Sequence, residues 1–140
     1  SPIELESRFE VYSEQYVLSI EVEAKLVIDM AKTLIYPAAV SYLSTLASTG
    51  VGMASIGVEL DQSTAKTVAA HVNAMMEAVG KLSATLEKEE FGSTEEHMQF
   101  CANEVRGLMN EVRSHADLLE AEVADELWPL PKYQEMLFIK

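Results

Sequence analysis

Cysteine is nearly absent from this sequence, which holds one, Cys101, among 140 residues. A single thiol forms no disulfide within the chain and builds no thiolate metal site on its own. This usage is typical of a reducing compartment, so we expect a cytoplasmic protein. The first residues also lack the basic start and apolar run of a signal peptide. Because they lack an initiating methionine as well, we expect a fragment of a longer protein.

Basic residues are scarce: 10 lysines and arginines stand against 23 aspartates and glutamates, giving a formal net charge of −13. A chain this acidic repels phosphate backbones and anionic headgroups, so we expect no nucleic-acid and no membrane partner. No stretch approaches the roughly 18 consecutive apolar residues of a membrane-spanning helix. Hydrophobic residues still make up 49% of the chain, enough for the continuous core of one domain.

Glycine and proline are few, six and four respectively, and they divide the chain into three long segments with a short tail. The first segment predicts a helix from about Ile3 to Ser48 that ends in the loop 48–52, where two glycines permit non-helical backbone. Pro37 lies inside this helix. Because proline has no N–H to donate to the carbonyl of Thr33, we expect the helix to bend or break there.

The apolar residues of the first segment form two stripes that differ in phase. The register shifts by one residue between Tyr16 and Ile20, which rotates the apolar face about the helix axis. We therefore expect the first four turns to pack on something different from the rest, such as a partner outside this sequence. The first stripe is Leu5, Phe9, Tyr12 and Tyr16, and the second is Ile20, Ala24, Val27, Ala31, Leu34 and Ala38.

The second segment runs from about Asp61 to Glu90, and its apolar residues alternate at spacings of three and four without exception, as in a coiled-coil seam. Residues of these types at this spacing predict a packed core rather than a cofactor site. The stripe is Ala65, Val68, Val72, Met75, Val79, Leu82 and Leu86, widened by Ala69 and Met76.

A third helix is expected to begin after Ser93, which is positioned to cap it, with Glu96 reaching back to the Ser93 N–H as a capping box. It must end by Leu127 or Trp128, because the residue before Pro129 is pushed out of helical geometry. Its predicted buried stripe is Val105, Met109, Val112, Ala116, Leu119 and Val123.

Long amphipathic helices joined by short loops lie antiparallel to their neighbours. The predicted fold class is therefore all-α: an antiparallel up-down bundle of three long helices over 1–128, with an extended aromatic C-terminal tail over 129–140. The helices would be counted as four if the first is broken near Pro37.

The three histidines, His71, His97 and His115, are the first candidates for a chemical site. His71 lacks the lysine and glycine that follow a phosphotransfer histidine. Glu111 lies one helical turn from His115, but a di-iron bundle needs paired Glu-x-x-His motifs, so an ordinary surface pair is the plainer interpretation. Glycine-rich phosphate loops, nucleophile elbows and histidine metalloprotease motifs are also missing. We therefore predict no catalytic, cofactor-binding or metal-binding residue in this chain.

The tail is too apolar for a free chain end. One alternative is that it folds back along its own bundle and caps it. The other is that it docks on another domain or subunit, where aromatic side chains supply the large buried area that anchors interfaces. The candidate docking residues are Trp128, Pro129, Tyr133, Leu137 and Phe138.

The run 126–138, which reads ELWPLPKYQEMLF, resembles the C-terminus of type III glutamine synthetases. The helix at 106–119 also fits the helix before that tail. The resemblance spans nearly the whole chain, although 49–94 agrees only in helical character. The segments that resemble the start of the family's C-terminal helical region are 5–10, 20–24, 29–32 and 35–38.

This resemblance implies a parent enzyme that uses ATP and Mg²⁺ or Mn²⁺ to join ammonia to the side chain of glutamate through a glutamyl phosphate. It implies large rings, commonly dodecamers, so the partners of this chain would be its own catalytic domain and sibling subunits. The family's metal, nucleotide and glutamate ligands belong to that catalytic domain, and their motifs do not occur here. The chain would then be an accessory helical domain that supports assembly.

Two alternatives stay open. Three glycines make the connection 49–60 the most mobile part of the chain, and such a loop could bind an effector or inhibitor protein as a regulatory module. The other alternative is a stand-alone helical adaptor or sensor bundle with no parent enzyme.

Overall fold

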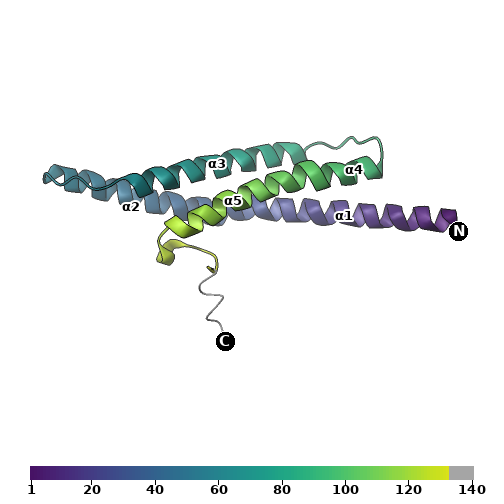
Figure 1. Cartoon of the computed structure of the whole chain (residues 1–140), viewed down its shortest axis with the longest axis horizontal. Helices are drawn as coiled ribbons and strands as arrows, with labels where there is room; N and C mark the ends of the chain where they lie inside the picture. The colour runs from purple at the N-terminus through teal and green to yellow at the C-terminus, as the bar shows by residue number, and fades with distance from the viewer. Residues whose placement is uncertain (133–140) are drawn as a thin grey trace, which may run out of the picture.

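The computed structural model describes residues 1–132, which form three long helices with no strand among them (Figure 1). The first helix consists of α1 (Pro2–Met30), a π-helical turn η1 (Ala31–Ile35) and α2 (Tyr36–Ser55). The second helix is α3 (Ser63–Leu86). The third consists of α4 (Thr94–Phe100), a second π-helical turn η2 (Cys101–Val105) and α5 (Arg106–Glu122), and it is followed by a 3-10 turn η3 (Asp125–Leu127). The prediction of an all-α fold with three long helices is confirmed.

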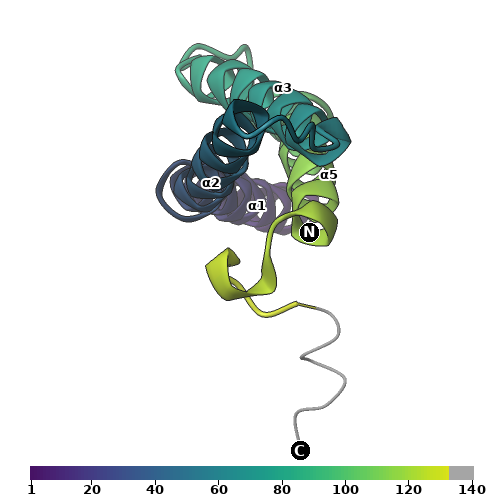
Figure 2. The same ribbon diagram turned by 90° about the vertical axis from the view of Figure 1, so that its left-hand side faces the viewer.

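The three helices lie lengthwise beside one another around a common axis (Figures 1 and 2). α3 returns alongside the first helix, and α4 and α5 then run back from the opposite end (Figure 1). α3 and α5 share the most extensive contact, and α1 packs against α3, α4 and α5. Because the first helix has 54 residues and α3 has 24, the first helix extends beyond its neighbours at both ends.

The first helix ends later than predicted. It continues through Gly50 and Gly52 to Ser55, and the chain turns at Gly57, whose φ of 83° lies in the left-handed region. The predicted end in the loop 48–52 is therefore wrong. A glycine inside a helix costs only about 1 kcal/mol relative to alanine, whereas positive φ strongly favours glycine, so the turn forms where that conformation is needed.

Pro37 does not break the first helix. The turn immediately before it is π-helical, and the amide of Tyr36 donates its hydrogen bond to the carbonyl of Ala31, five residues earlier. This wider turn adds one residue to the helix without interrupting it. Of the expected bend or break near Pro37, the break, and with it the count of four helices, is wrong.

The π-helical turn shifts the buried face of α2 by one residue. Ile35 and Ala39 are buried in place of the predicted Leu34 and Ala38, and Leu34 is 39% exposed. The physical reason is that one additional residue rotates everything after it by about 100° about the helix axis. Before the turn, the predicted stripe holds, with buried Ile20, Ala24 and Ala31 and half-buried Val27.

The predicted stripes of the second and third helices are confirmed, and together with α1 they enclose one continuous core. The buried residues of α3 include Val68, Val72, Met75, Val79 and Leu82. Those of the third helix and its end include Val105, Met109, Val112, Leu119 and Val123. The remaining predicted members, Ala65, Leu86 and Ala116, are half-buried.

The cap of the third helix forms with one shifted partner. Ser93 Oγ accepts a hydrogen bond from the N–H of Glu96 at 3.1 Å, as predicted. The Glu96 carboxylate accepts its bond from the N–H of Gly92 at 2.8 Å, one residue before the predicted donor. The first bond pairs an N–H that the helix start leaves without an internal partner, and the second ties the residue before the cap to the first turn. Together they fix where the helix begins.

One helix among the described residues, Pro2–Ser55, is long and apolar enough to cross a membrane by length and composition alone. A single helix of this kind is weak support for a membrane protein, because a core helix of a soluble bundle passes the same test. Here one face of that helix packs in the bundle core.

Candidate docking surfaces

The N-terminal end of the first helix extends past the helices it packs against (Figure 1). All residues from 1 to 12 are exposed. They include three members of the first predicted stripe, Leu5, Phe9 and Tyr12, whose exposed fractions are 66%, 47% and 62%. Residues 1–12 therefore lie outside the bundle core, whereas Ser13 is already buried. That these first turns pack on a different partner stays a prediction.

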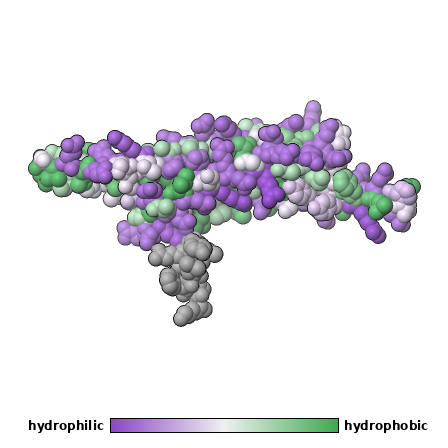
Figure 3. All heavy atoms as spheres, viewed as in Figure 1, coloured by the Kyte–Doolittle hydropathy of each residue, from purple (hydrophilic) through white to green (hydrophobic). Residues whose placement is uncertain are grey.

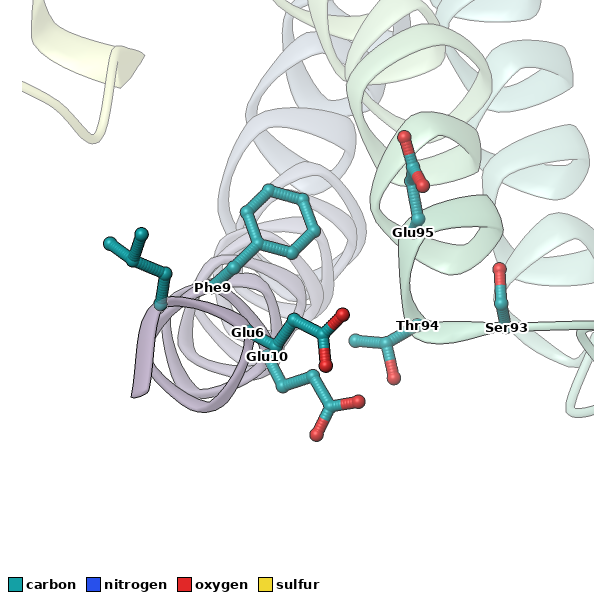
Figure 4. A pocket seen from close by; sticks show the side chains of 7 residues that line it. Glu6, Phe9, Glu10, Ser93, Thr94 and Glu95 are labelled. Carbon is teal, nitrogen blue, oxygen red and sulfur yellow. The ribbon is translucent and has the colours of Figure 1, made fainter. Parts of the chain in front are cut away.

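A shallow groove lies between this end of α1 and the first turn of α4. Figure 4 shows the Phe9 ring on α1, with Glu6 and Glu10 reaching toward Thr94 and with Glu95 further along α4. The groove thus presents one aromatic ring with carboxylates around it. Such an arrangement suits a protein surface that offers apolar and basic side chains together.

A second row of apolar side chains runs along α1 opposite the core. It consists of Val11, Leu18, Val22 and Leu26, which we call the outer face of α1, and each is between 52% and 62% exposed. At about 100° per residue, Leu18 lies roughly 160° from the buried Ile20, and Val22 roughly 160° from the buried Ala24. α1 is therefore apolar on both sides, and the rest of the chain approaches the outer face at Leu26, which lines a groove with Leu130.

The far end of the first helix is apolar as well. Val51 and Ile56 are 73% and 71% exposed, and hydrophobic atoms gather at the left-hand end of the molecule in Figure 3. No lysine, arginine, aspartate or glutamate occurs from 33 to 58. In a chain with 33 such residues in total, this stretch is the one most suited to a dry contact.

The beginning of the predicted tail folds against its own bundle. Trp128 and Leu130 are half-buried against the core, and Leu130 lines a groove with Leu26 of α1 and Val112 of α5. The Nζ of Lys132 donates to the carbonyl of Val123 at 3.4 Å and to the carboxylate of Asp125. Of the other predicted docking residues, Pro129 is exposed, and Tyr133, Leu137 and Phe138 lie outside the described residues.

The histidines fall into two groups that the sequence did not reveal. His71 and His115 lie against each other, with ring centroids 5.8 Å apart, on α3 and α5. His97 instead faces Glu21 of α1, with Nε2 3.1 Å from Oε1. Glu111 is exposed, and the His115 ring lies against His71, so the structure does not support a site formed by Glu111 and His115.

Among residues 1–132, the side chains of Asp61 and Cys101 have shifted pKa values. The backbone N–H of Ser63 donates to the Asp61 carboxylate at 2.9 Å, and this bond, with the Ser63 side chain, lowers the pKa of Asp61. Burial, and secondarily the charge of Glu21, raise the pKa of the Cys101 thiol. The first shift belongs to the start of α3, and the second to the contact between α1 and the third helix.

Sequence reasoning missed the outer face of α1 and the apolar end of α2. The outer face repeats at spacings of seven, four and four, which is itself a helical period. The uncharged stretch from 33 to 58 was a second available signal. What these surfaces have in common is apolar area on a rigid helix, which suits binding to protein.

Comparisons with known proteins find glutamine synthetases. The sequence model of a family described as the glutamine synthetase C-terminal domain matches residues 1–53. The chain is 35% identical, over its whole length, to a type-3 glutamine synthetase of Dictyostelium discoideum. It is 32% identical, over 98% of its length, to a glutamine synthetase of Bacteroides fragilis (strain YCH46). The chain spans about 20% of the length of each of these relatives.

Proposed function

Because the chain belongs to the family of glutamine synthetase C-terminal domains, we propose that it is the accessory helical domain of a type III glutamate–ammonia ligase. In this proposal the parent enzyme consumes ATP with Mg²⁺ or Mn²⁺, acts in the cytoplasm, and carries its catalytic groups outside this chain. The bundle contributes no catalytic residue and supports the packing of the parent. This family relationship also argues against a stand-alone adaptor or sensor.

The observation that carries the proposal is the outer face of α1. Leu18 and Val22 are 62% and 58% exposed on a helix whose opposite side is fully packed. A row of large apolar side chains left in water is typical of an interface that another protein covers. In relatives of which this chain spans 20%, the remaining four fifths is polypeptide against which such a domain can pack.

We therefore assign the outer face of α1 to the domain's own catalytic domain or to a sibling subunit of the same homo-oligomer, such as a dodecamer. The division of the chain into a bundle over 1–128 and a tail over 129–140 is part of the proposal. In it the tail docks beyond the bundle through Pro129, Tyr133, Leu137 and Phe138, and Trp128, which packs partly on the core, lies at its base.

The test places a charge on the outer face in the full-length enzyme. Leu18→Glu and Val22→Glu should lower subunit association in light scattering, or the melting temperature, because each leaves a carboxylate at a desolvated contact. Gln99→Glu is the matched control, since it adds the same charge at an exposed position of α4. We expect that variant to behave as the wild type.

A second measurement separates docking from folding. In the 140-residue chain alone, Leu18→Glu should change the free energy of unfolding by no more than about 0.5 kcal/mol, because position 18 is exposed there. Unchanged assembly and melting of the full-length Leu18→Glu and Val22→Glu enzymes would contradict the proposed role.

The apolar end of α2 favours a second candidate function, binding of an effector or inhibitor protein. Val51 and Ile56 both precede the turn at Gly57, and the segment outside regular helix there is 56–62, shorter than expected from the sequence. Calorimetric titration of the full-length enzyme with candidate effectors, repeated with Val51→Ser, tests it. Heat that Val51→Ser leaves unchanged would reject this end of the molecule as the site.

A further inference from the structure

A cluster of three potential metal ligands lies where the first helix meets the third. Glu21 comes from α1, His97 from α4, and Cys101 from the first residue of η2, one helical turn after His97. Their ligand atoms, one carboxylate oxygen, one imidazole nitrogen and the thiol sulfur, all lie within 4.8 Å of one another. We propose that Glu21, His97 and Cys101 bind a zinc ion.

The donor set selects the kind of ion. One sulfur, one nitrogen and one oxygen suit zinc, whereas Mg²⁺ and Mn²⁺ prefer sites made of oxygen ligands. Zinc at ordinary bond lengths holds its tetrahedral ligand atoms about 3.4 Å apart. Nε2 of His97 already lies 3.1 Å from Oε1 of Glu21, so the main adjustment is a small approach of the Cys101 sulfur. Three protein ligands leave the fourth position to water.

The surroundings hold the imidazole in place. The ring of Phe91 stacks on the ring of His97, with centroids 4.0 Å apart and planes 10° from parallel. The ring of Phe91 in turn contacts the ring of Phe100, one residue before Cys101, with ring centroids 5.1 Å apart. A ligand whose ring plane is fixed by packing loses little freedom when it binds an ion.

The site is closed on one side and open on the other. Cys101 is only 1% exposed, while the side chains of His97 and Glu21 are 28% and 34% exposed. An ion can therefore enter past these two residues and reach the buried sulfur. Binding forms the metal–sulfur bond and releases the thiol proton to solvent, so one proton leaves for each ion bound.

The bound ion would join α1 to α4 through Glu21 and His97, which are 76 residues apart in the sequence. An ion that binds only the folded chain raises its stability by an amount that grows with the logarithm of the ion concentration. This role is independent of the proposed docking function, because it concerns contacts within the chain.

Cobalt(II) is the probe for the experiment, since a cobalt–thiolate bond has a charge-transfer absorption in the near ultraviolet. The 140-residue chain is titrated with cobalt chloride and then with zinc chloride. We expect one cobalt ion per chain with that absorption, its displacement by zinc, and a higher melting temperature with zinc. Because the chain is used alone, failure of the docking proposal leaves the result unaffected.

Three variants locate the site. Cys101→Ser should abolish the charge-transfer absorption, and His97→Gln and Glu21→Gln should each weaken ion binding by about tenfold or more. The last two replace half-exposed side chains, so they remain informative if the buried Cys101→Ser variant fails to fold. His115→Gln is the matched control and should leave binding unchanged. Absence of the absorption from the wild type, or equal weakening by His115→Gln and His97→Gln, would overturn the assignment.

Discussion

The amide of Tyr36 donates its hydrogen bond to the carbonyl of Ala31, five residues earlier, and this bond closes the π-helical turn that sets the buried face of α2. The third helix contains the same feature, since the amide of Arg106 bonds to the carbonyl of Cys101. Each π-helical turn begins and ends on a buried residue. Each therefore behaves as a one-residue insertion placed where the three helices pack.

Deletion of Thr33 tests this interpretation of the first π-helical turn. Thr33 is exposed. Its removal shortens the spacing from Ala31 to Ile35 from four residues to three, and the spacing to Ala39 from eight to seven, and both new spacings fit an α-helix. We expect the free energy of unfolding to fall by less than about 1 kcal/mol, measured by urea denaturation. Deletion of the exposed Lys25, within regular α-helix, rotates one part of the core against the other and should cost about 3 kcal/mol or more. Equal losses in the two deletions would contradict the insertion model.

Leu119 and Leu118 are neighbours in α5 with opposite surroundings. Leu119 is fully buried, whereas Leu118 is 45% exposed. Leu119→Ala should destabilise the chain by about 2–5 kcal/mol, because it removes buried methyl groups and leaves a cavity. Leu118→Ala, the matched control, should cost less than about 1 kcal/mol in the same urea titration. A similar cost for both would mean that α5 packs by a different face.

Ser13 is completely buried on α1, and its hydroxyl has no hydrogen-bond partner. Ser13→Ala should therefore raise the free energy of unfolding by about 1–2 kcal/mol, since the unpaired hydroxyl loses its hydration on folding. Ser19→Ala, at an exposed position of the same helix, should gain only the helix propensity of alanine, about 0.5 kcal/mol or less. A gain at position 13 no larger than that at position 19 would show that the hydroxyl is satisfied.

Asp61 gives a pH dependence with a defined sign. Because the Ser63 N–H lowers the pKa of Asp61 in the folded chain, the folded state favours the ionised carboxylate. Its stabilising contribution is present above the pKa of the unfolded chain and is lost as the pH falls through the lowered folded value. The difference in melting temperature between wild type and Asp61→Asn should therefore be largest near neutral pH and vanish in strong acid. Glu59→Gln, which removes one negative charge nearby, controls for the change in net charge.

The sequence predicted the core of this protein best where the helices are regular. In α3, apolar residues repeat without interruption from Val68 to Leu82, and all five expected core positions there are buried. After Ala31 the same reasoning placed the core one residue too early. The sequence does not reveal a π-helical turn, because apolar residues lie both three and four positions after Ala31, and either spacing fits a helix.

The candidate surfaces were harder to predict for a different reason. α1 has two apolar faces, and the one that the bundle buries depends on its neighbours, which periodicity does not specify. Glu21 and His97 lie 76 residues apart, so their contact depends on the relative alignment of two helices. The tail resisted prediction because folding back and docking outward both follow from the same apolar side chains.

The unbroken length of the first helix has a mechanical consequence. Its 54 residues, at about 1.5 Å each, form a rod about 80 Å long whose two ends project from the bundle. If the first helix pivots near its middle, where the bundle packs on it, a tilt of the helix by about 5° displaces its two ends by about 3–4 Å in opposite directions. A neighbour that pushes on Phe9 would thus shift Val51 at the other end, so the helix can act as a lever between two distant contacts.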